Sequence, residues 1–160
     1  MLIKTVLALT DGSQNSRNSL RYGVEICRKF EADLHILSVI EDMPSYINLE
    51  VGAEFMAKIQ ETIKSEVVTC SGYCETSGIK CTGMIRHGIP YEEIVAYAEE
   101  IDADLIVMST HGHTGLSHIL LGSVAEKIVR HAPCPVLTTR LDSKTWDIPE
   151  CKDSVAENLI

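Results

Sequence analysis

The sequence lacks long apolar runs and an excess of basic residues. No stretch approaches the roughly 18 uninterrupted apolar residues that a membrane span needs. The opening MLIKTVLALTDGS has one lysine, a short apolar run and no small-residue cleavage site, which is not typical of a signal peptide. A net charge of −9 without a Lys/Arg stripe repels phosphate backbones. We therefore expect a cytoplasmic protein that binds neither a membrane nor nucleic acid.

Three common motifs of phosphate binding and nucleophilic catalysis are also missing. The pattern GxxxxGKS/T does not occur, and no GxGxxG follows the first apolar run. The GxSxG motif, which presents a nucleophilic serine on a strand-to-helix turn, is absent as well. A hydrolase built from Ser109 or Thr110, His111 and Asp11 is therefore the less favoured alternative.

The six cysteines are scattered among segments that already supply a core, and a cytosolic chain keeps such thiols reduced. Cys70 and Cys74 continue an apolar stripe that begins at Met56 and recurs every three or four residues. We therefore interpret this CxxxC pair as part of a buried helix face rather than as a metal or redox site.

Short apolar runs alternate with longer segments that have helical periodicity. Such runs, bounded by turn residues, are typical of strands buried on both faces. The expected strands are residues 3–9, 34–39, 79–85, 104–109 and 136–140. Four helices are expected. One is capped by Ser13 or Ser16, one follows a loop at 40–52, one has Pro90 as its first residue, and one begins at Gly122 or Ser123. This alternation predicts an α/β domain with a single doubly wound five-stranded parallel sheet and helices on both faces.

The pattern covers residues 1–140 and stops there. The last 20 residues hold five acidic residues, two lysines and the only tryptophan, Trp146. We expect residues 141–160 to be an acidic C-terminal tail that is mobile, with an ordered cap or a partner-binding helix as the alternative.

The helix before the fifth strand is expected to bury one apolar face, which consists of Leu121, Val124, Ala125, Ile128 and Val129.

A glycine-containing loop, His111 to Ser123, follows the fourth strand. Gly112 and Gly115 let the backbone approach a ligand, and Gly122 and Ser123 lie at the start of a helix. The free N–H groups and the positive end of the helix dipole favour an anion there. The loop therefore indicates a phosphate site, although glycines at such a turn can serve backbone conformation alone.

Asp11, at the end of the first strand, belongs to the same edge of the sheet, where open parallel sheets bind ligands. Its carboxylate could accept ribose hydroxyls or hold a divalent cation, and the alternative is a turn or helix-cap residue. His111, His113 and His118 lie in the glycine loop, but their spacing matches no common zinc motif. A histidine there would instead donate a hydrogen bond to phosphate, and its titration would make binding sensitive to pH.

Three segments carry a resemblance to a known family. The opening VLALTDGS, the run GIPYEEIVAYAEEIDADLIVMSTHGHTGL and the run LLGSVAEKIVRHAPCPVLTTR are similar to the universal stress protein family across residues 1–140. Its nucleotide-binding members carry Gly, two residues, Gly, nine residues, and then Gly followed by Ser or Thr. On this chain the second glycine is Gly112 and the closing pair is Gly122 and Ser123, while Ser109 stands at the first glycine.

The resemblance implies an ATP-binding regulatory protein of the stress response, with the strand order 3-2-1-4-5. It implies a homodimer that pairs through strand 136–140 and also has protein partners that the sequence leaves unidentified. The ligand would be ATP, or AMP or ADP, and the protein would be non-catalytic or a very slow ATPase. Independently of the resemblance, the Asp11 carboxylate could hold Mg²⁺ together with the nucleotide phosphates. The implied nucleotide-binding residues are Thr10, Asp11, Val39, Met108, Ser109, Thr110, His111, Gly112, His113, Thr114, Gly122, Ser123 and Val124. The alternative is an interaction module of the same fold that binds no nucleotide and works through its dimer surface or its tail.

Overall fold

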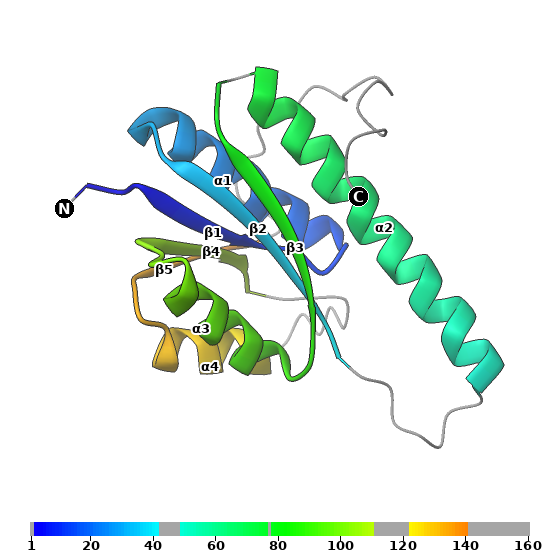
Figure 1. The fold of residues 1–160 in the computed structure, drawn as a ribbon. Coiled ribbons are helices and arrows are strands. Elements are labelled where there is room, and N and C mark those ends of the chain that lie inside the picture. Colours follow the sequence, from blue (N-terminus) through cyan, green and yellow to red (C-terminus); the bar gives the residue numbers. More distant parts are fainter. Residues whose placement is uncertain (1, 42–48, 77, 111–121, 141–160) are drawn as a thin grey trace.

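Strands and helices alternate along the chain in the computed structural model, which describes residues 2–41, 49–76, 78–110 and 122–140 (Figure 1). The strands are β1 (Thr5–Leu9), β2 (Asp33–Ile40), β3 (Cys81–His87), β4 (Leu105–Ser109) and β5 (Val136–Thr139). The helices are α1 (Gln14–Phe30), α2 (Leu49–Thr76), α3 (Pro90–Glu100) and α4 (Ser123–His131). All paired strands are parallel, in the order β3-β2-β1-β4-β5, which confirms the predicted topology.

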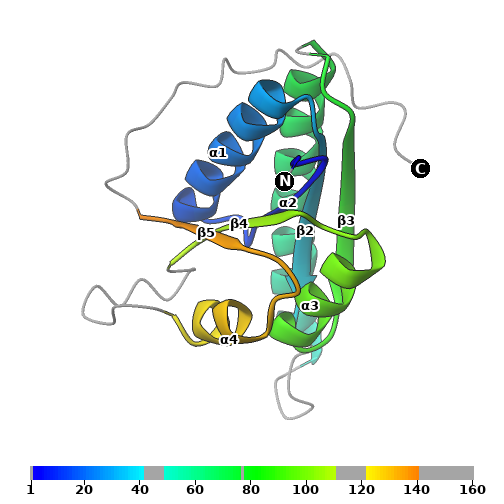
Figure 2. The same cartoon turned by 90° about the vertical axis from the view of Figure 1, so that its left-hand side faces the viewer.

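Helices cover both faces of the sheet, with α1 and α2 on one side and α3 and α4 on the other (Figures 1 and 2). Each side has its own apolar core. Val24 and Ile63 belong to the core on the α1 and α2 side, and Ile94 and Ile128 to the other. Neighbouring residues of β1 alternate between the two cores because successive strand side chains point to opposite faces. This explains why β1 is an unbroken apolar run.

The turn after β1 starts α1. Gly12 has φ 81°, in the left-handed region that glycine adopts without strain. Ser13 is the N-cap, and its hydroxyl accepts a hydrogen bond from the Ser16 backbone N–H at 3.2 Å. Of the two predicted caps, the structure therefore has Ser13.

Several expected boundaries were wrong. β1 begins at Thr5 and not at residue 3, and β2, β4 and β5 differ from their predicted bounds by one residue. The predicted loop at 40–52 is too long, because α2 begins at Leu49 and continues through Gly52. A single glycine lowers the stability of a helix but does not have to end it. The third strand lies two residues later than predicted. It pairs with β2 from Leu34–Cys81 to Ile40–His87, so the length of β2 determines where β3 ends.

The buried face of α2 matches the prediction where its side chains are described. Cys70 and Cys74 are buried in the core, with Ile63 and Val67 on the same stripe. The prediction for α4 was wrong at Val129, which is 50% exposed, whereas Ala125 and Ile128 are buried. The helix lies on the sheet through a narrower stripe than its five apolar residues indicated, and Leu121 lies outside the described residues.

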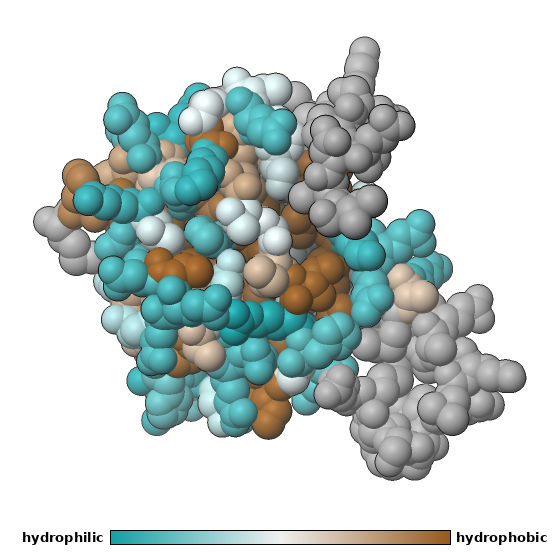
Figure 3. Space-filling view, viewed as in Figure 1, coloured by the Kyte–Doolittle hydropathy of each residue, from teal (hydrophilic) through white to brown (hydrophobic). Residues whose placement is uncertain are grey.

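Hydrophilic residues cover much of the face shown in Figure 3, with separate hydrophobic patches between them. Within the described ranges, no helix combines the length and the apolar character required to cross a membrane. The predicted tail, residues 141–160, lies outside the described residues.

Candidate functional site

A cavity of about 240 Å³ opens at the carboxyl ends of β1 and β4. β1 lies between β2 and β4 in the sheet. The chain places β2 and β3 on one side of β1 and then places β4 and β5 on its other side. Crevices of doubly wound sheets bind ligands at this switch point. The described residues that line the cavity are Leu9, Thr10, Asp11, Ser16, Leu37, Val39, Pro90, Ile94, Met108, Ser109, Thr110, Gly122, Ser123, Val124 and Ala125.

The structure brings most of the expected site residues to this cavity. Nine of them line it, namely Thr10, Asp11, Val39, Met108, Ser109, Thr110, Gly122, Ser123 and Val124. The other four, His111, Gly112, His113 and Thr114, lie outside the described residues, as do Gly115 and His118.

Sequence reasoning missed the wall that α3 contributes. Pro90 and Ile94 lie at the beginning of this helix and line the cavity. The available signal was the turn that ends in Pro90, because α3 begins directly after β3 at the carboxyl edge of the sheet. Ser16 and Leu37 also line the cavity and were not predicted. Leu37 belongs to β2, the strand that also carries Val39, and Ser16 belongs to α1, the helix that follows Asp11.

Hydrogen bonds within the β1 turn fix the polar wall. The Thr10 hydroxyl lies 3.1 Å from the Ser16 hydroxyl and accepts the Gly12 N–H at 3.2 Å. The Asp11 carboxylate accepts the Ser13 N–H at 3.0 Å. Asp11 is thus a turn residue, as the alternative interpretation held, and it also faces the cavity. The two roles are compatible because a carboxylate has two oxygens and several lone pairs.

The beginning of α4 forms the opposite wall. Gly122 is the N-cap and has no side-chain hydrogen bond to cap the helix. The Glu126 N–H donates to the Gly122 carbonyl at 2.8 Å, which is the first helical bond. The N–H groups of Ser123, Val124 and Ala125 precede that bond, so they have no acceptor within α4. Together with the helix dipole, they provide a site for an anionic group.

Gly122 holds this helix start against the end of β4. Its N–H donates to the Thr110 carbonyl at 2.9 Å, and a Cβ atom at this position would lie 3.1 Å from that oxygen. The Thr110 N–H in turn donates to the Thr139 carbonyl at 2.9 Å. The sheet edge therefore fixes where the α4 N–H groups lie.

The floor and the α3 side of the cavity are apolar. Leu9, Leu37 and Met108 are buried, Ile94 is buried on α3, and Val39 is half-buried. This arrangement suits a ligand that has one apolar part and one anionic part.

A charged cluster holds α3 next to the site. The Tyr97 hydroxyl lies 3.0 Å from His35 Nδ1, and the Arg86 guanidinium lies 4.6 Å from the centroid of the Tyr97 ring. Arg86 also pairs with Glu93 at 3.6 Å and with Glu100. Burial lowers the pKa of His35, while Asp33 opposes this effect. The cluster links β2 and β3 to the helix that supplies Pro90 and Ile94, and its residues do not line the cavity.

No group of three His, Cys, Asp or Glu side chains in the described part of the chain is placed to hold a metal ion. A cation near Asp11 would therefore need further oxygen ligands, which a bound polyphosphate provides.

The sheet order and the position of this cavity define a doubly wound α/β protein with a ligand crevice at its switch point. Residues 2–140 match the family model described as the universal stress protein family. The chain is 35% identical over 147 residues to universal stress protein MJ0531 of Methanocaldococcus jannaschii, covering 89% of this chain and 85% of that protein. The protein described here belongs to the universal stress protein family.

Solved structures share the fold. Protein MJ0577, also from M. jannaschii, superposes with a TM-score of 0.73 at 31% identity, covering 88% of this chain and 97% of the other. A universal stress protein in complex with cAMP superposes with a TM-score of 0.67 at 23% identity, covering 87% of this chain and 98% of the other.

Proposed function

We propose that this protein binds an adenine nucleotide, with ATP as the expected ligand, and that binding serves regulation in the stress response rather than catalysis. The observation that carries the proposal is the pairing, in one cavity, of an apolar wall with the uncapped start of α4. An adenine base suits the apolar wall, and phosphates suit the N–H groups of Ser123, Val124 and Ala125. The cAMP held by a protein of the same fold supports an adenine nucleotide as the ligand class.

The proposed contacts follow from where the lining residues lie. Val39 would contact the base, Thr10 and Asp11 would lie by the adenosine, and Met108 and Ser109 would line the ribose and the phosphates. Asp11 would hold Mg²⁺ together with phosphate oxygens. The absence of GxSxG and of the P-loop pattern supports a non-catalytic or very slow ATPase role.

Calorimetric titration with ATP, AMP and cAMP tests the proposal, using two variants at one position. Ser123→Pro removes a single backbone N–H at the first residue of α4, where proline is tolerated. Gly122 has φ −66° and ψ 153°, a conformation that also suits the residue before a proline. Ser123→Ala is the matched control, because it removes the hydroxyl and keeps the N–H.

Hydrogen bonds to charged groups contribute about 1.5–3 kcal/mol, so we expect Ser123→Pro to weaken ATP binding by roughly tenfold to a hundredfold. The Ser123→Ala change should be smaller, and both variants should unfold at nearly the wild-type temperature. Wild-type protein that binds none of the three nucleotides would refute the proposal and favour the nucleotide-free interaction module.

We also propose a homodimer through β5. This strand is at one edge of the sheet, so the N–H and C=O groups along its outer side are available to a second strand. Leu137 on β5 is 36% exposed. Met84 on the opposite edge strand, β3, is also 36% exposed and provides the matched control. By light scattering, Leu137→Lys should convert a dimer to a monomer and Met84→Lys should not. A wild-type monomer would contradict the proposal.

A further inference from the structure

An open groove lies on α1, on the outer surface of the molecule and away from the nucleotide cavity. Its described lining comes from this one helix and consists of Tyr22, Glu25, Ile26, Arg28, Lys29 and Phe30. Tyr22, Ile26 and Phe30 are spaced four residues apart, so they form one apolar stripe. Tyr22 and Ile26 also pack against the core, whereas Phe30 is 47% exposed. The groove therefore presents an aromatic and aliphatic surface flanked by charged side chains.

The charge of α1 is unusual for this protein. It contains four basic residues and one acidic residue, a net charge of +3, in a chain whose net charge is −9. By contrast, α2 and α3 each contain more acidic than basic residues, and α4 has a net charge of +1. The one acidic residue, Glu25, pairs with Arg28 at 2.6 Å, and Lys29 is exposed beside it. An acidic segment would be attracted to α1 and repelled by α2 and α3.

The chain itself supplies a segment of matching composition. Residues 141–160 contain five acidic residues and two lysines, a net charge of −3, together with Trp146 and several aliphatic residues. We propose that residues 141–160 dock on the α1 groove of the same molecule, with Trp146 against Ile26 and Phe30. The occupant is thus an acidic segment with an aromatic anchor, and the receiving surface is a basic helix with an apolar stripe.

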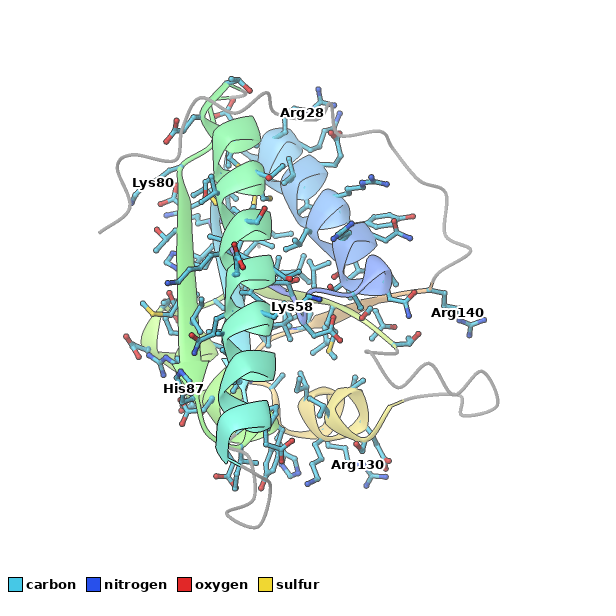
Figure 4. The ribbon with its side chains drawn as sticks, turned by 90° about the vertical axis from the view of Figure 1, so that its right-hand side faces the viewer. Arg28, Lys58, Lys80, His87, Arg130 and Arg140 are labelled. Carbon is cyan, nitrogen blue, oxygen red and sulfur yellow. The ribbon has the colours of Figure 1, made fainter. Side chains whose placement is uncertain are left out.

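The geometry of the chain permits this contact. α1 contacts β5, and Figure 4 shows Arg140, the residue after β5, near the beginning of α1, with Arg28 toward the other end of the helix. Ile26 lies about 18 Å along α1 from its first residue at 1.5 Å per residue. The six residues from Arg140 to Trp146 span up to roughly 20 Å when extended. An extended segment that leaves β5 along α1 therefore brings Trp146 level with the groove.

Trp146 is the only tryptophan, so its fluorescence in the full-length protein reports on the contact directly. Acrylamide quenching measures its exposure to solvent. We expect quenching in the wild type to be several-fold weaker than in urea, and stronger at high salt because the attraction is screened. The double variant Arg28→Glu/Lys29→Glu should raise quenching toward the value in urea. Phe30→Ser should do the same without changing any charge.

Lys58→Glu/Lys64→Glu is the matched control. Both lysines are exposed on α2, so this pair introduces the same change in total charge elsewhere on the molecule. The control should leave quenching unchanged, and circular dichroism should confirm that every variant is folded. Three results would overturn the proposal: a wild-type Trp146 as exposed as in urea, a protected Trp146 that the α1 variants leave protected, or protection that depends on protein concentration, which would mean docking on a second copy.

Discussion

The close contact between β3 and α2 predicts a strong coupling between Gly83 and Val67. A Cβ atom built on Gly83 would lie 2.1 Å from Val67 Cγ1 and 3.5 Å from Val67 Cβ. Carbon atoms in contact are normally about 3.5–4.0 Å apart. Val67 is 8% exposed and belongs to the core between α2 and the sheet. Gly83→Ala therefore requires α2 to move away from β3 or Val67 to change its rotamer.

The cost of that change follows from two opposing effects. Inserting a methyl group into a packed core costs about 1–3 kcal/mol, and a valine in a helix strongly prefers one rotamer. Replacing glycine by alanine within a strand recovers about 0.5–1 kcal/mol of conformational entropy. We therefore expect Gly83→Ala to lower the free energy of unfolding by about 0.5–2 kcal/mol, with a loss of roughly 1–8 °C in Tm for a domain of this size.

A double-mutant cycle separates this clash from any other effect of the substitution. Val67→Ala removes the methyl groups that the new Cβ would meet, and by itself it should cost about 1–2 kcal/mol. In that background Gly83→Ala should be neutral or slightly stabilising, which gives a coupling of about 1–3 kcal/mol. Urea unfolding followed by far-UV circular dichroism measures all four proteins. The same loss from Gly83→Ala in both backgrounds would show that α2 does not pack on β3 as described.

Two further predictions concern groups whose pKa values the fold shifts. Burial lowers the pKa of His35 below its ordinary value of 6.5, so the unfolded chain binds more protons than the folded chain as the pH falls through 6.5. The free energy of unfolding should therefore decrease on acidification, and a pH series of urea unfolding should show a smaller decrease for His35→Gln. Burial raises the pKa of Cys27 to about 12, and hydrogen bonding to Cys70 raises that of Cys74. A thiol reagent should therefore label Cys27 and Cys74 rapidly only in denaturant, and rapid labelling of either of these two cysteines in the native protein, identified by peptide mapping, would contradict this burial.

Local pattern was sufficient to predict most of the fold. The apolar runs that became β1, β2 and β4 are buried from both sides, so each gives a clear signal without help from distant residues. The end of β3 was different, because it depends on pairing with β2, a contact between residues nearly fifty positions apart. The prediction that Val129 is buried was wrong for a similar reason. Its periodicity fits the buried face of α4, but the angle at which a helix lies on a sheet is a tertiary property.

The candidate site was predictable where a motif was continuous in sequence. Thr10 and Asp11 directly follow β1, and Gly122 and Ser123 are the cap and the first residue of α4, so topology alone brings them to one edge. Pro90 and Ile94 follow β3, which is two strands away from β1, and only the three-dimensional course of α3 brings them to the cavity. Sequence reasoning concentrated on the loops at the switch point and therefore missed this wall.

The two helices that begin at the switch point differ in how their first turns are satisfied. At α1 the Ser13 hydroxyl accepts the Ser16 N–H, so part of the donor set is already occupied by the chain itself. At α4 the cap is Gly122, which has no side chain to accept a hydrogen bond. A glycine cap costs only about a few tenths of a kcal/mol relative to the best cap residues, and its lack of a side chain leaves the N–H groups of the first turn to a ligand. The difference explains why phosphates are expected at α4 although both helices point their positive ends toward the same crevice.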